Sequence, residues 1–265
     1  MDYGMPTLLE LPALEDCAAL CRELGLRFIE LNMNMPQYQP ERMQAAQYRR
    51  IAEKYGVYYT IHLDESLNVS DYNRRVSQAY IDTVIETIDI ARELKAPILT
   101  MHLSRGVYFT LPGKRVYLFS ENEEQYLGTM RAFRDVAEKA IGTDDITLCV
   151  ENSDGYIDFQ IKALDLLLES KAFALTFDIG HNYVIGGVDE PVILSRADKL
   201  CHMHLHDARE KENHLPLGDG ELGLHKYIDL AKKHDCRCVL ETKTVAGLIK
   251  SVEWWKGSAS HELSR

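Results

Sequence analysis

Short apolar runs recur along the chain, and each is followed by a longer segment in which apolar residues repeat with a helical period. The runs are rich in β-branched and aromatic residues, which favour strands. Eight runs can be distinguished, at 2–9, 27–33, 57–63, 97–103, 146–151, 173–178, 200–206 and 236–241. The pattern predicts eight β-strands, although Pro6 interrupts the first run.

The segments that follow the runs predict helices. They lie at 13–24, 41–55, 71–95, 121–141, 160–170, 190–197, 224–234 and 245–256. In the third of these, Val76, Tyr80 and Val84 recur at four-residue spacing. This spacing puts them on one helix face, which can pack against a sheet.

Strands that alternate with helices in this way indicate parallel βαβ units. Eight such pairs within the length of one domain favour a closed (β/α)8 TIM barrel, in the α/β class, over an open doubly wound sheet. No G-x-G-x-x-G sequence follows the first run, so we expect no nucleotide cofactor.

The chain has no Gly/Ser-rich or Pro-rich linker, so we expect one barrel domain over residues 1–257. The polar segment 258–265 is expected to be a flexible C-terminal tail. The segment 104–120, after the fourth run, stands outside the alternation. Two strand-like stretches there flank the turn sequence Leu-Pro-Gly-Lys, which predicts a hairpin-like insertion after strand 4. A lid over the barrel mouth is the role we expect for it.

Composition agrees with a soluble globular protein. The chain has 265 residues, of which 46% are hydrophobic and 27% charged, values that exclude a disordered, collagen-like or coiled-coil chain. No window approaches the ~20 apolar residues that a membrane span needs, and the N-terminus does not resemble a signal peptide, so we expect a cytoplasmic protein. We therefore expect the six cysteines to be reduced.

The formal net charge is −11. This acidic balance argues against nucleic acid as a partner, because Lys and Arg supply most of the affinity for a phosphate backbone. It leaves open a small-molecule enzyme or a binding module.

Acidic and imidazole side chains gather where the predicted strands end. Strand ends carry His62, His102, Glu151, Asp178, His204 and Glu241, while His181 lies just beyond the sixth strand and His214 lies in the loop after the seventh. The carboxyl ends of barrel strands form the active-site face, and imidazole with carboxylate suits a divalent metal. Any one of these groups could be a hydrogen-bonded core residue or a helix cap. Together they would be costly to bury unless they were paired or metal-bound.

Several segments resemble the xylose-isomerase-like TIM-barrel superfamily. They are IHLDESLNVS, VENSDG, TFDIGH, HMHLHDAREKENHLPLGDGELG and LETK. The resemblance covers nearly the whole chain, and its most specific parts are the sequence from Asp178 to His181 and the stretch from His204 to Gly220. The superfamily contains sugar isomerases, ketose 3-epimerases and endonuclease IV.

The epimerase pattern implies one divalent metal ion (Mn, Mg, Co or Zn) held by Glu151, Asp178, His204 and Glu241. It also implies that Glu151 and Glu241 are an acid–base pair acting on a small sugar, sugar phosphate or polyol derivative. A dehydratase would use the same chemistry. His202 has the same strand parity as His204, as has His206, so periodicity leaves the choice of ligand open. The resemblance selects His204.

Other residues are candidate substrate contacts. The resemblance implies this role for His181 and, with imperfect spacing, for Arg209. Lys243 lies two residues beyond Glu241 and therefore on the same side of the strand. Arg105 in the insertion could bind a substrate phosphate.

Endonuclease IV-like enzymes imply an alternative, a trinuclear zinc phosphodiesterase. All eight of the acidic and imidazole residues named above fit that pattern, and Glu212 stands where that family has an aspartate. The charge of −11 and the absence of a Lys/Arg-rich track argue against it. A noncatalytic barrel, which would bind no stoichiometric metal, is the third alternative. Glu30 is predicted either to face the mouth or to be bonded inside the barrel, and a homo-oligomer is also compatible with the sequence.

Overall fold

Eight parallel strands form a closed barrel within the part of the chain that the computed structural model describes, the backbone of residues 1–262 and the side chains of 1–258. The strands are β1 (Asp2–Pro6), β2 (Phe28–Asn32), β3 (Tyr58–His62), β4 (Ile98–His102), β7 (Thr147–Glu151), β8 (Phe173–Asp178), β9 (Leu200–Leu205) and β12 (Arg237–Leu240). They follow one another around the barrel in chain order, and β12 pairs with β1. The predicted (β/α)8 fold is confirmed, and Pro6 is the last residue of β1.

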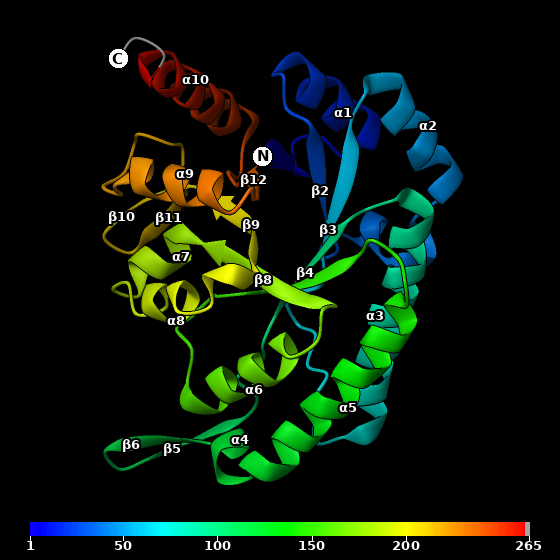
Figure 1. Cartoon of the computed structure of the whole chain (residues 1–265), viewed down its shortest axis with the longest axis vertical. Coiled ribbons are helices and arrows are strands. Elements are labelled where there is room, and N and C mark those ends of the chain that lie inside the picture. Colours follow the sequence, from blue (N-terminus) through cyan, green and yellow to red (C-terminus); the bar gives the residue numbers. More distant parts are fainter. Residues whose placement is uncertain (263–265) are drawn as a thin grey trace.

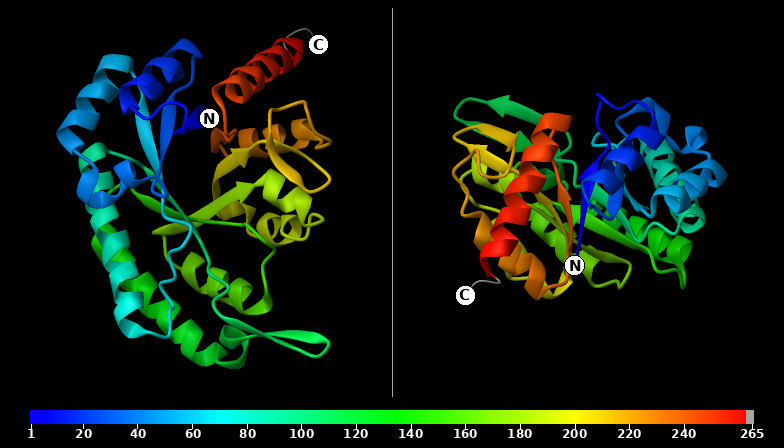
Figure 2. Two further views of the ribbon diagram at one scale, coloured as in Figure 1. Left: turned by 180° about the vertical axis from the view of Figure 1, so that it is seen from behind. Right: turned by 90° about the horizontal axis from the view of Figure 1, so that it is seen from above.

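Helices surround the barrel, as Figure 1 and Figure 2 show. The principal ones are α1 (Leu14–Glu23), α2 (Ala45–Tyr55), α3 (Arg74–Leu94), α5 (Glu123–Ile141), α6 (Asp158–Leu168), α8 (Glu190–Leu194), α9 (Leu224–Lys233) and α10 (Val245–Glu262). On α3, Val84, Ile88 and Ala91 are fully buried, but Val76 near the start of the helix is 37% exposed, so the predicted apolar face packs inward only over the later part of the helix. None of the described helices is long and apolar enough to cross a membrane.

The C-terminal helix is longer than the sequence suggests. α10 continues to Glu262, past Ser258, where the predicted tail begins. The added turn contains no proline, which would end a helix there. The last part of the predicted tail, 263–265, lies outside the described residues. All six cysteines are within the described chain and are free.

Two hairpins lie outside the barrel. The antiparallel pair β5 (Tyr108–Leu111) and β6 (Lys114–Tyr117) occupies the segment in which the insertion is predicted. It projects from the body beside the short helix α4 (Leu118–Glu121), and Val107 and Phe109 are more than half exposed. The second hairpin, β10 (Asp207–Arg209) and β11 (Glu212–Leu215), follows β9 and is not predicted from the sequence.

The barrel interior is polar in its middle. TIM barrels usually fill this space with layers of branched apolar side chains. Here the fully or almost fully buried residues include Glu30, Thr60, Thr100, Thr176 and His202. Glu30 is only 2% exposed. A polar layer of this kind is stable only if its groups satisfy one another.

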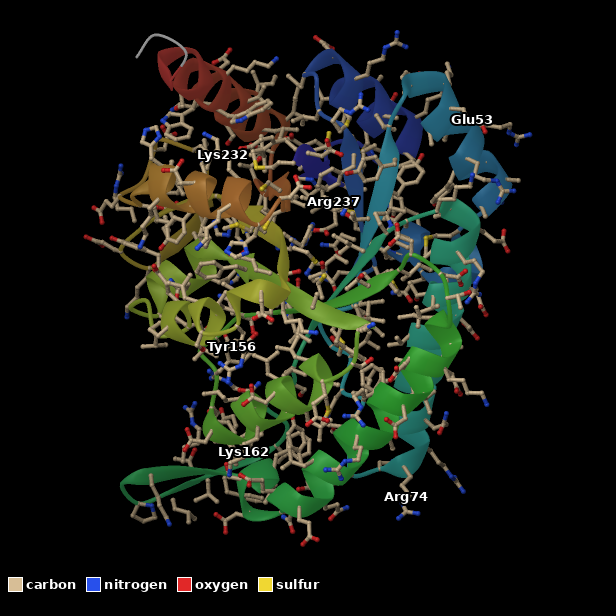
Figure 3. All side chains as sticks on the ribbon, viewed as in Figure 1. Glu53, Arg74, Tyr156, Lys162, Lys232 and Arg237 are labelled. Atoms are coloured by element: carbon tan, nitrogen blue, oxygen red, sulfur yellow. The ribbon has the colours of Figure 1, made fainter. Side chains whose placement is uncertain are left out.

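Figure 3 labels Arg237, at the start of β12, and Tyr156, in the loop after β7, so the first belongs to the end of the barrel where strands begin and the second to the end where they finish. The site described next lies at the end where the strands finish. The Tyr156 backbone N–H donates to Asp189 Oδ1 at 2.7 Å, which ties the loop after β7 to the segment before α8.

Truncating a core side chain of a barrel strand tests this packing. Leu148 on β7 is fully buried, whereas Leu9 is 82% exposed. We expect Leu148→Ala to lower the free energy of unfolding by roughly 2–5 kcal/mol, because a cavity forms in addition to the lost burial. Leu9→Ala should change it by less than about 0.5 kcal/mol. Urea unfolding monitored by circular dichroism measures both, and equal effects would contradict the described core.

Candidate functional site

Four consecutive strands bring one histidine and three carboxylates together. Glu151 ends β7, Asp178 ends β8, His204 lies near the end of β9, and Glu241 follows β12. One potential ligand atom from each of the four lies within 4.8 Å of the others. Asp178 pairs directly with His204 in the sheet, which sets their relative height. The structure thus brings together the four residues that the sequence analysis groups as metal ligands.

His204 is at the centre of this group and is fully buried. Its Nδ1 atom lies 2.8 Å from Glu151 Oε1, 3.3 Å from Glu241 Oε2 and 3.8 Å from Asp178 Oδ2. Its other ring nitrogen, Nε2, lies 2.8 Å from Glu30 Oε1. One edge of the imidazole therefore faces the three carboxylates, and the other faces the barrel interior.

Glu151 is surrounded by imidazoles. Its Oε2 atom lies 3.1 Å from His62 Nε2 and 3.0 Å from His102 Nε2. Burial disfavours ionisation of this carboxyl, but His204 and His102 outweigh burial and hold its pKa well below the usual range. Burial likewise opposes a charge on His62, yet the hydrogen bond that His62 donates to Glu151 raises the pKa of His62 to about 9. In the metal-free protein this group is thus a set of charge-compensated pairs.

A second group adjoins the first. His181, His206 and His214 each place a ring nitrogen within 4.8 Å of the others. Asp178 connects the two groups, because its Oδ2 lies 3.0 Å from His206 Nε2 while its Oδ1 accepts a 2.6 Å hydrogen bond from the backbone N–H of His181. The rings of His206 and His214 stack with centroids 4.2 Å apart.

His206 is the member of this group that the sequence analysis does not select. A signal for it exists in Gly180, in the short helix α7 (Ile179–Val184). A Cβ atom at position 180 would lie 2.0 Å from the His206 ring, so only glycine fits there.

Glu212, which the sequence analysis offers as an additional ligand, is exposed on β11 and lies outside the metal-capable groups of the described residues. His102 contacts Glu151 but also lies outside those groups.

Two side chains fix the loops that carry the site. Asn152 accepts a hydrogen bond from the backbone N–H of Asp178 and donates one to its carbonyl oxygen, both at 2.9 Å, so it joins the ends of β7 and β8. Asp207 accepts from the backbone N–H groups of Leu222 and Gly218 at 3.1 and 3.0 Å. These bonds hold the loop after β11 against the end of β9.

The donor set fits a divalent cation. Glu241 Oε2 is buried and has no hydrogen-bond partner among the described residues, although it faces His204. Burial favours the neutral form of Glu241, but His204 outweighs it and keeps the pKa of this carboxyl well below its usual range. Three converging carboxylates and one imidazole are ligands that manganese, cobalt and zinc accept. An orphaned anionic oxygen in such a cluster is an atom that a cation would satisfy.

Besides His181, the three other predicted substrate contacts differ in position. Lys243 Nζ lies 3.4 Å from Glu241 Oε1 with its side chain 62% exposed, so it stands at the rim of the group. Arg209 instead donates to the backbone carbonyl of Asp219. Arg105 donates to two backbone carbonyls in the loop after β7, which anchors the base of the hairpin insertion to that loop.

The chain is similar in sequence and in fold to several known proteins. A family model described as a xylose isomerase-like TIM barrel matches residues 18–258. An uncharacterised protein of Methanocaldococcus jannaschii, MJ1614, is 24% identical over 206 residues, which cover 75% of this chain and 76% of that protein. A D-tagatose 3-epimerase-like protein superposes with a TM-score of 0.78 at 20% identity, covering 98% of this chain and 97% of that one. The IOLI protein, solved with a zinc atom, gives 0.71 at 12% identity, with 98% and 96% covered.

Divalent cations should stabilise the fold through this site. At a Mn²⁺ or Co²⁺ concentration about 100 times the dissociation constant, binding adds about 2.7 kcal/mol to the free energy of unfolding. Each kcal/mol raises the melting temperature by roughly 2–4 °C in a domain of this size. Asp178→Asn should abolish most of the shift, because it removes the carboxylate shared by both groups.

The matched control is Asp189→Asn, which changes a buried carboxylate outside the metal-capable groups of the described chain. Differential scanning fluorimetry with and without EDTA gives the shift for each variant. An equal shift in the wild type and Asp178→Asn would show that the cation binds elsewhere.

Proposed function

Because the chain belongs to the xylose isomerase-like TIM-barrel family, we propose that it is a divalent-metal-dependent isomerase or epimerase of a small sugar, sugar phosphate or polyol derivative. The observation that carries this proposal is that two glutamates, Glu151 and Glu241, share one compact group with Asp178 and His204. The likeness in fold to a D-tagatose 3-epimerase-like protein supports it.

Such reactions move a proton at a carbon that lies between a carbonyl and a hydroxyl group. One carboxylate must remove this proton, and an acid must return a proton, to the neighbouring carbon in an isomerase or to the opposite face of the same carbon in an epimerase. A bound divalent ion would supply Lewis-acid polarisation of the substrate oxygens. Asp178 and His204 would complete the set of ligands.

The surroundings of the two glutamates suggest different roles. Glu241 Oε2, which has no hydrogen-bond partner among the described residues, would bind the cation, and this leaves Oε1, beside Lys243 Nζ at the rim, to accept a proton. Glu151 Oε2 contacts the Nε2 atoms of His62 and His102, which can supply a proton to it. We therefore assign Glu241 as the base and Glu151 as the acid in one direction of the reaction, and the reverse in the other. Lys243 at the rim is our candidate for a substrate contact.

A second candidate function rests on the overlapping histidine groups. The set of His62, Glu151 and His204 shares two members with the central group, and the set of His181, His206 and His214 is connected to it through Asp178. Three adjacent ions would suit the in-line displacement of a phosphodiester. The net charge of −11 argues against a nucleic-acid substrate, although three divalent ions would bring it to about −5. The isomerase or epimerase proposal therefore remains our first.

Substitution of the proposed base should abolish turnover. We expect Glu241→Gln to lower kcat by at least about 10²-fold, because general base catalysis contributes 10²–10⁴-fold. The assay screens ketoses, aldoses and their phosphates in D₂O, and proton NMR detects deuterium entering the substrate. The matched control Glu212→Gln alters an exposed glutamate near the rim and should keep the wild-type rate. If Glu241→Gln and Glu151→Gln both exchange deuterium at the wild-type rate, the acid–base assignment is wrong.

Metal stoichiometry separates the candidate functions. We expect about one manganese, cobalt or zinc ion per chain, measured by inductively coupled plasma mass spectrometry on protein purified without chelator. About three ions, with cleavage of a duplex that contains an abasic site, would favour the phosphodiesterase instead. A chain that binds no stoichiometric metal would be a noncatalytic barrel.

A further inference from the structure

A fourth carboxylate lies beneath the metal-capable group, inside the barrel. Glu30 on β2 is 2% exposed, and its Oε1 atom is 2.8 Å from His204 Nε2. This contact is on the opposite edge of the ring from Nδ1, which faces Glu151, Asp178 and Glu241. The contact is a close ion pair without hydrogen-bond geometry, because Nε2 has no hydrogen-bond partner among the described residues, and it places Glu30 behind the one histidine of the central group.

Glu30 is itself held by neighbours from other strands. Thr60 Oγ1 on β3 donates a 3.2 Å hydrogen bond to Glu30 Oε2. His202 Nε2 lies 3.6 Å from the same oxygen. His202 Nδ1 in turn lies 3.1 Å from Thr176 Oγ1. The polar middle layer of the barrel therefore forms a continuous set of contacts that ends at His204.

We propose that Glu30 is a positioning residue that orients His204 so that Nδ1, and not Nε2, is presented to a divalent cation. The inference rests on the proposed metal dependence of the site. A metal-ligating histidine commonly directs its other ring nitrogen at a carboxylate, which fixes both the tautomer and the ring orientation. Thr60 and His202 would keep the carboxylate of Glu30 in place.

The burial of Glu30 argues for a specific role of its carboxylate. A charge deep inside a barrel is costly to desolvate and is tolerated only when it is paired and hydrogen-bonded. An apolar residue would fill the same space without this cost, as in the interior of most TIM barrels. The pairing of Glu30 with His204 explains why the layer is polar directly beneath the cluster.

The competing arrangement is a cation on the inner side. Glu30, His202 and His204 also have ligand atoms within 4.8 Å of one another. A cation there would bind His204 through Nε2. The proposal instead places a hydrogen on Nε2, facing Glu30. The two arrangements leave opposite ring nitrogens protonated.

Two measurements on the full chain test the proposal. Nitrogen-15 NMR of the histidine-labelled, Zn²⁺-loaded wild type identifies which ring nitrogen of His204 carries hydrogen, with His204→Gln used to assign the signal. We expect a protonated Nε2 and a metal-bound Nδ1. A metal-bound Nε2 would overturn the proposal, and this result does not depend on whether any Glu30 variant folds.

The second measurement is Co²⁺ affinity by competition titration. Glu30→Gln should weaken binding about 10–100-fold, the usual effect of losing such a carboxylate partner, and should change the visible spectrum of the bound Co²⁺. Thr60→Val should weaken binding less, and Asp189→Asn should leave it unchanged. Unaltered affinity and spectrum in Glu30→Gln would overturn the positioning role alone. Failure of the wild type to bind any ion would overturn the metal dependence and, with it, this inference.

Discussion

The concentration of buried charge at one end of the barrel is the constraint on which the rest of the structure depends. Glu30, Glu151, Asp178 and His204 are all at most 3% exposed, and they come from four different strands. Isolated charges could not remain there, so each carboxylate contacts at least one imidazole. His204 contacts all three of these carboxylates, which makes it the centre of compensation.

The surrounding fold serves to keep these groups at fixed separations. Asp178 is both a member of the cluster and the N-cap of α7, so the start of that helix is tied to the site. Asn152 joins two strand ends, and Asp207 holds the loop that follows β11. A divalent ion would replace part of the charge compensation that protonated histidines supply in the metal-free protein, and its binding would release those protons.

Much of this arrangement could be predicted from the sequence, because strands with a period of two end at definite residues. Glu151 and Asp178 end their predicted strands, and parallel strands of a barrel must finish on one face. His206 was harder to predict. His202, His204 and His206 alternate regularly, and each contacts a buried carboxylate, so the period of two could not separate one of them from the others. His214 was predicted as a candidate, but its position depends on a hairpin with positive φ at Glu210. This backbone conformation is uncommon for glutamate and has no signal in the sequence.

The central claim is that one divalent ion binds between Glu151, Asp178, His204 and Glu241. The most direct test is an anomalous difference map from crystals of the full chain grown with Mn²⁺. The account predicts a peak about 2.0–2.3 Å from His204 Nδ1 and from oxygens of the three carboxylates, as expected for first-row metal ligands. A map without a peak at this position, at saturating Mn²⁺, would contradict it.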